Sequence, residues 1–272
     1  MNQTSSRSSV SPLRFAIQDL VAGLAMWRLW MAFGYEDLRQ NYRRTLLGLT
    51  WIAISFGAFA FAYILIFSGL NQGHDARHFA TWAVSGALAW QFISHVVLTG
   101  ANVFIGSESW IKGVRLPLSV HIYKTLWRLA IQDGLSLVVA FALIFAFGSF
   151  SLAGCLVSLL AIPLYLLLAV PVQFIFGLAC VFSRDLQQFI GTFMRIAFFV
   201  TPIIWIPVPG TILQHVADIN PFAYMIDLFR MPILEGIFPL AALGIWFILF
   251  VVTSTLALIA YRWARPHLAY WL

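Results

Sequence analysis

The chain has 272 residues, of which 61% are hydrophobic and only 10% are charged, and its mean hydropathy is +0.89. Soluble domains contain about 45–50% apolar and about 25% charged residues, so this composition excludes an ordinary soluble protein and predicts an integral membrane protein. The formal net charge of +6 does not indicate nucleic acid. The Lys and Arg residues lie at the ends of apolar segments, where anionic lipid headgroups are the expected neighbours.

The N-terminal 45 residues precede the first long apolar segment. Residues 1–12 are polar and rich in Ser and lack the apolar core and cleavage site of a signal peptide, so we expect a disordered cytoplasmic tail. Residues 20–34 are apolar but too few to cross a bilayer, and Arg28 lies in their middle. We predict an interfacial amphipathic helix, because Trp27 and Trp30 suit the headgroup boundary; a buried re-entrant helix is the alternative. One face of this helix would carry Leu20, Leu24, Trp27 and Met31.

Six segments are long and apolar enough to cross the hydrocarbon of a bilayer, which takes about 20 mainly apolar residues. They are 46–70, 79–104, 126–147, 152–182, 189–207 and 237–261. The fourth is over-long and contains Pro163 and Pro171, which remove backbone donors and predict a kink. The sequence therefore predicts an all-α integral membrane protein, with a leading segment over residues 1–45 and a six-helix transmembrane domain over residues 46–272.

The basic residues indicate the orientation of these segments. Fourteen of the 16 Lys and Arg residues flank one side of the predicted spans, and only Arg77 and Arg230 fall on the other. Cytoplasmic loops are the ones enriched in Lys and Arg, so both termini are predicted to be cytoplasmic. An even number of spans agrees with this orientation. Arg39, Arg43 and Arg44 form part of the basic cluster just before the first span.

Residues 208–236 form the longest segment predicted on the outer side, and acidic and basic residues interrupt it too often for a span. Thr211 is placed to cap a short helix that ends at Ile219. Asn220 and Pro221 have the N-cap and first-turn chemistry of a second helix, which we expect to extend to Pro232. Two such helices could cover the outer mouth of a pathway. An amphipathic loop resting on the outer leaflet is the alternative.

Candidate chemistry in the sequence is sparse. No G-x-x-x-x-G-K-[ST] phosphate loop occurs, so ATP binding of that kind is excluded and any ATP-driven activity requires another chain. His74 and His78 have a metal-compatible spacing, but too few carboxylates accompany them for us to expect a metal site. Arg128 and Asp133, near the predicted start of the third span, could pair or could anchor the helix end at the interface. The favoured interpretation is the anchor, and the lack of other mid-span acids argues against proton-coupled transport.

Aromatic residues make up 16% of the chain, and four of them lie on one face of the first span. These four follow one another at spacings of three and four residues: Phe56, Phe59, Tyr63 and Phe67. Sugar rings present apolar C–H faces that stack on aromatic rings, so this stripe could line a path for a glycan. Packing against neighbouring helices or lipid is the alternative. Most Trp residues lie near span ends, which is typical of interfacial anchors: Trp51, Trp82, Trp110, Trp127, Trp205 and Trp263.

Several motifs in order along nearly the whole chain resemble those of one transporter family. Residues 42–51 (YRRTLLGLTW) resemble the start of the first span in ABC-2 type permeases that export polysaccharides, O-antigens, capsules and teichoic acids. Residues 110–117 (WIKGVRLP) resemble the cytoplasmic loop after their second span, with Gly113 where a second Lys is common. Arg184 and Asp185 followed by 201–205 (TPIIW) are similar to their fifth span, and 220–222 (NPF) to their outer segment.

The resemblance implies a homodimeric permease in the bacterial cytoplasmic (inner) membrane, docked on two copies of a separate ATPase that carries ATP and Mg²⁺. The chain itself would have no cofactor and no enzyme activity, and its partners would be membrane lipids and an undecaprenyl-linked glycan. ATPase coupling would fall to Trp110, Ile111, Lys112, Arg115 and Pro117. The interfacial helix and the start of the first span would contribute Trp27, Arg28, Trp30, Arg39, Arg43 and Arg44. An outer gate would contain Asn220, Pro221 and Phe222.

The leading hypothesis is therefore a permease subunit that exports a lipid-linked polysaccharide. An ABC-2 permease for a small amphiphile such as a drug is the first alternative, because an aromatic stripe suits both substrates. An integral-membrane transferase acting on polyprenyl-linked sugars would need acidic or His residues clustered at one interface, and the 10 acidic residues are scattered. A purely structural membrane module is the last alternative, and co-purification with an ATPase would discriminate against it.

Overall fold

The computed structural model describes residues 12–43, 45–68, 75–265 and 268–271, and these residues form helices and connecting segments without a β-strand. The helices are α1 (Pro12–Ala25), α2 (Trp27–Tyr42), α3 (Thr50–Ser68), α4 (Ala76–Asn102), the 3₁₀ helix η1 (Ile105–Ser107), α5 (Glu108–Gly113), α6 (Leu118–Phe147), α7 (Leu152–Ser158), α8 (Ala161–Phe182), α9 (Asp185–Val200), α10 (Ile212–Ile219), α11 (Pro221–Glu235), α12 (Leu240–Ala264) and α13 (Leu268–Trp271).

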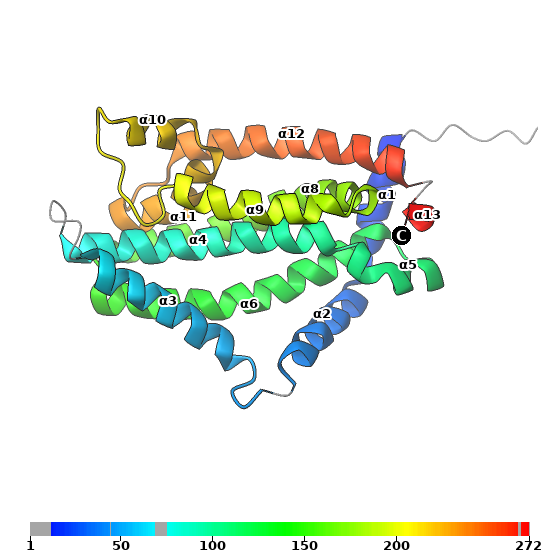
Figure 1. The fold of residues 1–272 in the computed structure, drawn as a ribbon, viewed down its shortest axis with the longest axis horizontal. Helices are drawn as coiled ribbons and strands as arrows, with labels where there is room; N and C mark the ends of the chain where they lie inside the picture. Colours follow the sequence, from blue (N-terminus) through cyan, green and yellow to red (C-terminus); the bar gives the residue numbers. More distant parts are fainter. Residues whose placement is uncertain (1–11, 44, 69–74, 266–267, 272) are drawn as a thin grey trace, which may run out of the picture.

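The long helices lie side by side along the long axis of the molecule (Figure 1). Helix α4 packs against α3, α6, α8, α9 and α11, and α8 also packs against α12. Helices α1, α5 and α13 gather at one end of this bundle, whereas α10 and α11 lie at the opposite end (Figure 1). The all-α prediction is confirmed, and the segments predicted on opposite sides of a membrane do lie at opposite ends of the bundle.

Among the described residues, four helical segments are long and apolar enough to cross a membrane: α4, α6, α7 with α8, and α12. Helices α3 and α9 occupy the predicted first and fifth spans; α3 has 19 residues, and its side chains are described as far as Ile66, whereas α9 has 16 residues. Helix α9 ends at Val200 because Pro202 disfavours the helical conformation of the residue before it and lacks a backbone donor. The predicted end of this span at residue 207 was therefore wrong.

Helix α6 begins at Leu118, eight residues before the predicted start of the third span at Leu126. Asp19 of α1 satisfies its exposed amide donors, since the two carboxylate oxygens accept hydrogen bonds from the backbone N–H groups of Leu118 (3.0 Å) and Ser119 (2.9 Å). Lys124, in the second turn of α6, pairs with Asp37 of α2 at 2.8 Å. Each residue of α6 therefore lies about two turns further from the start of the helix than the sequence suggested.

The fourth predicted span contains the expected interruption. Helices α7 and α8 are separated by a turn at Leu159 and Leu160. Pro163, in the first turn of α8, has no N–H to donate to the carbonyl of Leu159, so the chain tightens there instead of continuing one helix. Pro171 lies inside α8 without ending it.

The N-terminal segment forms two helices and not the single helix predicted over residues 20–34. The break falls at Met26, between α1 and α2. Helix α1 packs on α6 and α12, and α2 packs on α6, where Trp30 meets the rings of Tyr123 and Trp127 at centroid distances of 6.0 and 6.1 Å. The predicted apolar face is partly exposed, because Leu24 and Trp27 are 56% and 50% exposed.

The two helices predicted after the fifth span are present as α10 and α11. Asn220 caps α11 as expected: its side chain accepts a hydrogen bond from the N–H of Phe222 at 2.9 Å, and Pro221 is the first helical residue. The hydroxyl of Thr211 donates to the carbonyl of Val208 instead of capping α10. Helix α11 continues through Pro232 and ends at Glu235; the next residue, Gly236, has a φ of +72°, which suits glycine.

Helix α11 is not a loop resting on the outer surface. It packs against α4, α7 and α12, and four of its side chains are fully buried: Ile226, Leu228, Arg230 and Ile233. At the α7 crossing, a side chain on Gly154 would overlap the backbone carbonyl of Pro232, so the two helices approach as closely as a glycine allows. The alternative interpretation of residues 208–236 is therefore wrong for α11.

Candidate functional site

A polar cluster joins α4 and α6 in the middle of the bundle. Gln91 and His95 lie one turn apart on α4, and both contact Asp133 of α6. The Gln91 amide donates from Nε2 to Asp133 Oδ1 (2.8 Å) and to Ser136 Oγ (2.9 Å), and His95 Nδ1 lies 2.9 Å from the same Oδ1. The Asp133 side chain is only 9% exposed, whereas that of His95 is 28% exposed. Among the described residues, Asp133 Oδ2 has no hydrogen-bond partner.

The sequence analysis missed this cluster because it placed Asp133 near the start of a span. In the structure Asp133 is the sixteenth of the 30 residues of α6, so it lies at mid-helix, and within the described residues it forms no ion pair with Arg128. The helix-end anchor and the view that mid-span regions lack acids were both wrong here. Charged groups at this depth are costly and usually functional. The spacing of Gln91 and His95 was the available signal.

A hollow of about 360 Å³ lies beside this cluster, on the side where α2, α3, α4 and α6 face one another. It is lined by Tyr42, Trp51, Ile52, Ser55, Phe56, Phe59, Gln91, His95 and Gln132. Two of the four predicted path residues therefore line the same hollow: Phe56, which is 4% exposed, and Phe59, which is 53% exposed. Tyr63 is buried and packs on Phe59 with ring centroids 4.4 Å apart, but it is not among the lining residues. The side chain of Phe67 lies outside the described residues.

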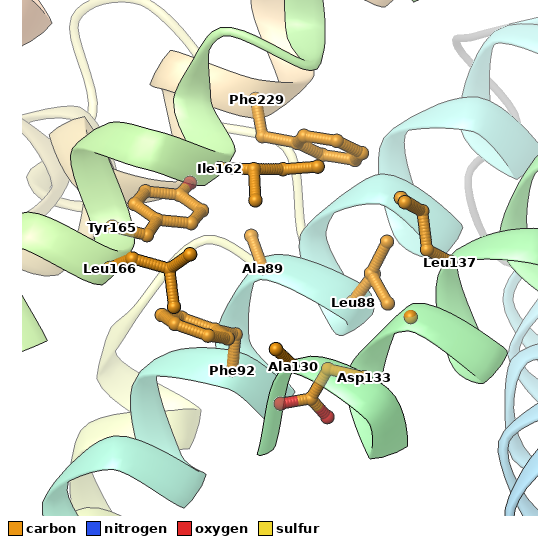
Figure 2. Close-up of a pocket in the computed structure, with 11 residues that line it drawn as sticks. Leu88, Ala89, Phe92, Ala130, Asp133, Leu137, Ile162, Tyr165, Leu166 and Phe229 are labelled. Carbon is orange, nitrogen blue, oxygen red and sulfur yellow. The ribbon is translucent and has the colours of Figure 1, made fainter. Parts of the chain in front are cut away.

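A second hollow, of about 120 Å³, is lined in part by Asp133 itself (Figure 2). Its walls come from α4, α6, α8 and α11, and Asp133 is the one charged residue among those that line it. The remaining walls are apolar or aromatic, including Leu88, Phe92, Tyr165 and Phe229 (Figure 2). Asp133 therefore lines an apolar hollow, whereas Gln91 and His95, which bond to it, line the hollow that mixes aromatic and hydrogen-bonding side chains.

The predicted coupling residues lie together at the end of the bundle that contains α1 and α13 (Figure 1). Trp110 of α5 is 46% exposed and packs on Phe33 of α2, with ring centroids 4.8 Å apart. Lys112 pairs with Glu108 at 2.7 Å, and this hydrogen bond and positive charge lower the pKa of Glu108. The remaining three residues, Ile111, Arg115 and Pro117, line a surface hollow of about 570 Å³ together with Asp19 and Arg265.

The residues assigned to the interfacial helix divide into exposed and packed groups. Trp27 is half exposed, and the guanidinium of Arg28 lies 5.2 Å from its ring centroid. Trp30 is turned toward α6, as described above. Arg39 lies on the exposed face of α2, 3.7 Å from Glu36. Arg43 is exposed just after α2, and Arg44 lies outside the described residues.

The predicted outer-gate residues connect two of the motifs quoted above, residues 220–222 and residues 201–205. Asn220 donates from Nδ2 to the hydroxyl of Thr201 at 3.0 Å, which ties the start of α11 to the segment that follows α9. Phe222 packs edge-on against Trp90 of α4, with ring centroids 5.6 Å apart. Asn220 is buried, whereas Pro221 is exposed. The sequence showed the order of these two motifs along the chain, and the tertiary structure shows that they are in contact.

A fully buried arginine stands on the same helix α11. Arg230 is 0% exposed; its guanidinium carbon lies 3.9 Å above the ring centroid of Trp82, and Nη1 lies 3.7 Å from Asp227. The sequence analysis counted Arg230 as an outer-side charge and Trp82 as an interfacial anchor. Arg230 does lie on α11 at the end opposite α1 and α5, but it is enclosed in the bundle, and Trp82, which is 9% exposed, forms part of that enclosure.

The fold and these clusters define a class: a polytopic all-helical membrane protein with a mixed aromatic and polar hollow within its bundle. No family model matches the chain. The chain is similar to two proteins of Klebsiella pneumoniae described as O-antigen export system permeases. The first is 25% identical over 211 residues and the second 25% identical over 210 residues. Both alignments cover 74% of this chain and 78% of the relative. A permease of the same description from Myxococcus xanthus is 23% identical over 187 residues, 68% of this chain and 72% of the relative. These comparisons support the family of ABC-2 type O-antigen permeases and confirm the resemblance seen in the motifs.

Proposed function

We propose that the chain is the transmembrane permease subunit of an ABC exporter that moves a lipid-linked polysaccharide outward across the bacterial cytoplasmic membrane. The observation that carries this proposal is the similarity to O-antigen export system permeases over about three quarters of the chain. A separate ATPase drives the transport, since the sequence has no phosphate loop of its own. The chain is thus a non-enzymatic transport subunit, with ATP and Mg²⁺ bound by the partner.

The proposed topology has six crossings, with α3 and α9 added to the four helices of spanning length. Support for it comes from Figure 1, where α3 and α9 lie along the same bundle as the longer helices. The end that contains α1, α2 and α5 carries most of the basic residues and would face the cytoplasm. The permease would act as a homodimer with two ATPase copies. Residues 1–45 would then lead into a transmembrane domain over residues 46–272.

The proposed coupling surface is α5 with the extended segment 114–117, at the cytoplasmic end. Trp110 and Lys112 are about half exposed, so they are available to a partner. Helix α5 is also packed on α2 through Trp110 and Phe33, and α2 is packed on α6. Movement of a docked ATPase would therefore be transmitted to α6 by direct contact. The glycan would pass along the aromatic wall of α3, and α10 and α11 would form the outer gate.

A deletion strain tests the proposed function. Without the permease, undecaprenyl-linked glycan should accumulate inside the cell and the surface polymer should disappear, as seen by silver-stained gels and by labelling of intact cells. Complementation with the wild-type chain should restore both. Normal surface polymer in the deletion strain would overturn the proposal. Failure of the tagged chain to co-purify with any ATPase would overturn the proposed coupling.

A further inference from the structure

We propose that the hollow lined by α2, α3, α4 and α6 is a binding site for one sugar unit of the passing glycan, with Gln91, His95 and Gln132 as its hydrogen-bonding groups. This inference rests on the proposed function and names a substrate contact within it. Asp133 is a positioning residue: it holds Gln91 and His95 from behind through the hydrogen bonds at Oδ1.

First, Asp133 is buried at mid-helix, where a carboxylate lowers the stability of the bundle. Burying a carboxylate at the middle of a 30-residue membrane helix costs free energy. The hydrogen bonds at Oδ1 offset only part of this cost, because Oδ2 has no partner among the described residues. An apolar residue would pack α4 against α6 at lower cost. A carboxylate at this position is explained when its neighbours must be held in one orientation for a ligand.

The second argument is the orientation that Asp133 imposes on His95. His95 Nδ1 lies 2.9 Å from Asp133 Oδ1, so this contact fixes the orientation of the His95 ring. With Nδ1 engaged, Nε2 is the ring nitrogen left to contact a ligand hydroxyl. His95 lines the hollow and is partly exposed, as is Gln132. Together with the Gln91 amide, these groups supply acceptors and donors for hydroxyls.

The third argument is the composition of the hollow. Trp51, Phe56 and Phe59 provide aromatic faces on which the C–H face of a sugar ring can stack. Its volume of about 360 Å³ lies in the range of about 300–1,000 Å³ typical of small-ligand sites. No Lys or Arg is among its lining residues, and the described residues contain no group of three metal-ligating side chains. The hollow therefore favours an uncharged sugar unit over the pyrophosphate of a lipid anchor.

The test is a binding titration with the permease purified together with its ATPase in detergent. The probe is the surface polysaccharide of the same strain, released from its lipid by mild acid, and the signal is tryptophan fluorescence, because Trp51 lines the hollow. Gln91→Leu and Gln132→Ala should each raise Kd about tenfold, the loss expected for one buried hydrogen bond. Asp133→Asn should also weaken binding, because the charge that orients His95 is lost.

The matched control is Gln173→Leu, which removes an amide from α8. That amide is fully buried and bonded to the backbone of Val96 and to Thr99, outside the hollow. Its Kd should stay within twofold of wild type. If Asp133→Asn does not accumulate in the membrane, the partly exposed Gln132→Ala decides the question.

Wild-type affinity in both Gln91→Leu and Gln132→Ala would overturn this inference while leaving the proposed function intact, provided that the deletion strain lacks surface polymer. Normal surface polymer in the deletion strain would overturn the proposed function, whatever the titration shows. A tenfold loss in the variants, with the control unchanged, supports the sugar site.

Discussion

Replacement of Gly86 by Ala should destabilise the crossing of α4 and α11. A Cβ at this position would overlap Nη2 of Arg230 and would lie 3.1 Å from its Cζ and 3.4 Å from the carbonyl oxygen of Ile203. Arg230 has no route to solvent, because it is fully buried with its guanidinium against Trp82. The guanidinium must therefore shift off the ring, or α11 must move away from α4.

The expected magnitude follows from two opposing effects. Overpacking a closed interior costs about 1–3 kcal/mol. Alanine in place of glycine within a helix returns about 0.5–1 kcal/mol. The net loss should be about 1–2 kcal/mol, which corresponds to a decrease in Tm of about 2–8 °C. The assay is thermal unfolding of the purified protein in detergent, followed by circular dichroism.

Two further variants make this prediction specific. Gly244→Ala on α12 is the matched control, because nothing lies within 4 Å of a Cβ built there, and its Tm should be unchanged or higher. Arg230→Met supplies a slimmer, uncharged side chain, and in that background Gly86→Ala should cost much less, which a double-mutant cycle detects. The steric explanation is refuted if Gly86→Ala leaves Tm unchanged, or if its cost is the same with Met at position 230.

Three other predictions follow from contacts between elements. Asp19→Ala should lower the free energy of unfolding by about 1–3 kcal/mol, because the backbone N–H groups of Leu118 and Ser119 lose their acceptor. Equal Tm values for the variant and the wild type would contradict this. Tyr165→Phe should cost about 1–2 kcal/mol in the same unfolding assay, since its hydroxyl donates to the buried carbonyl of Met225, and a neutral result would show that this hydrogen bond contributes little. Lys112→Glu should leave Tm unchanged, because the side chain is 45% exposed, but should reduce the amount of ATPase that co-purifies severalfold; undiminished co-purification would exclude this residue from the docking surface.

The sequence was most informative where the signal is local. The polar-to-apolar changes located the helices, and Asn220 with Pro221 predicted the start of α11 to the residue, because capping depends on two or three neighbours in the chain. Pro163 likewise predicted the interruption of the fourth span. The order of four short motifs indicated the family that the comparisons support.

The errors arose where a residue's environment comes from another part of the chain. The third span was predicted to start at Leu126, but α6 starts at Leu118, where Asp19 of α1 accepts from its first amides and Asp37 of α2 pairs with Lys124, so Asp133 lies at mid-helix. The sequence placed Arg230 on the outer side but did not show that Trp82 and α4 enclose it. Hydropathy contains no information about the partner of a charged residue, so the burial of Arg230 and the mid-helix position of Asp133 were both missed.

The sequence by itself therefore determined that this chain is an all-α membrane protein, where most of its helices lie, and which transporter family its motifs resemble. Those properties follow from composition and local spacing. Only the tertiary structure decided that Gln91, His95 and Asp133 meet at mid-bundle, that Phe56 and Phe59 share a hollow with them, and that α11 is packed into the core. The contacts of Gln91 and His95 with Asp133 join residues 42 and 38 positions apart, and the periodicity of one helix contains no information about which neighbour it faces.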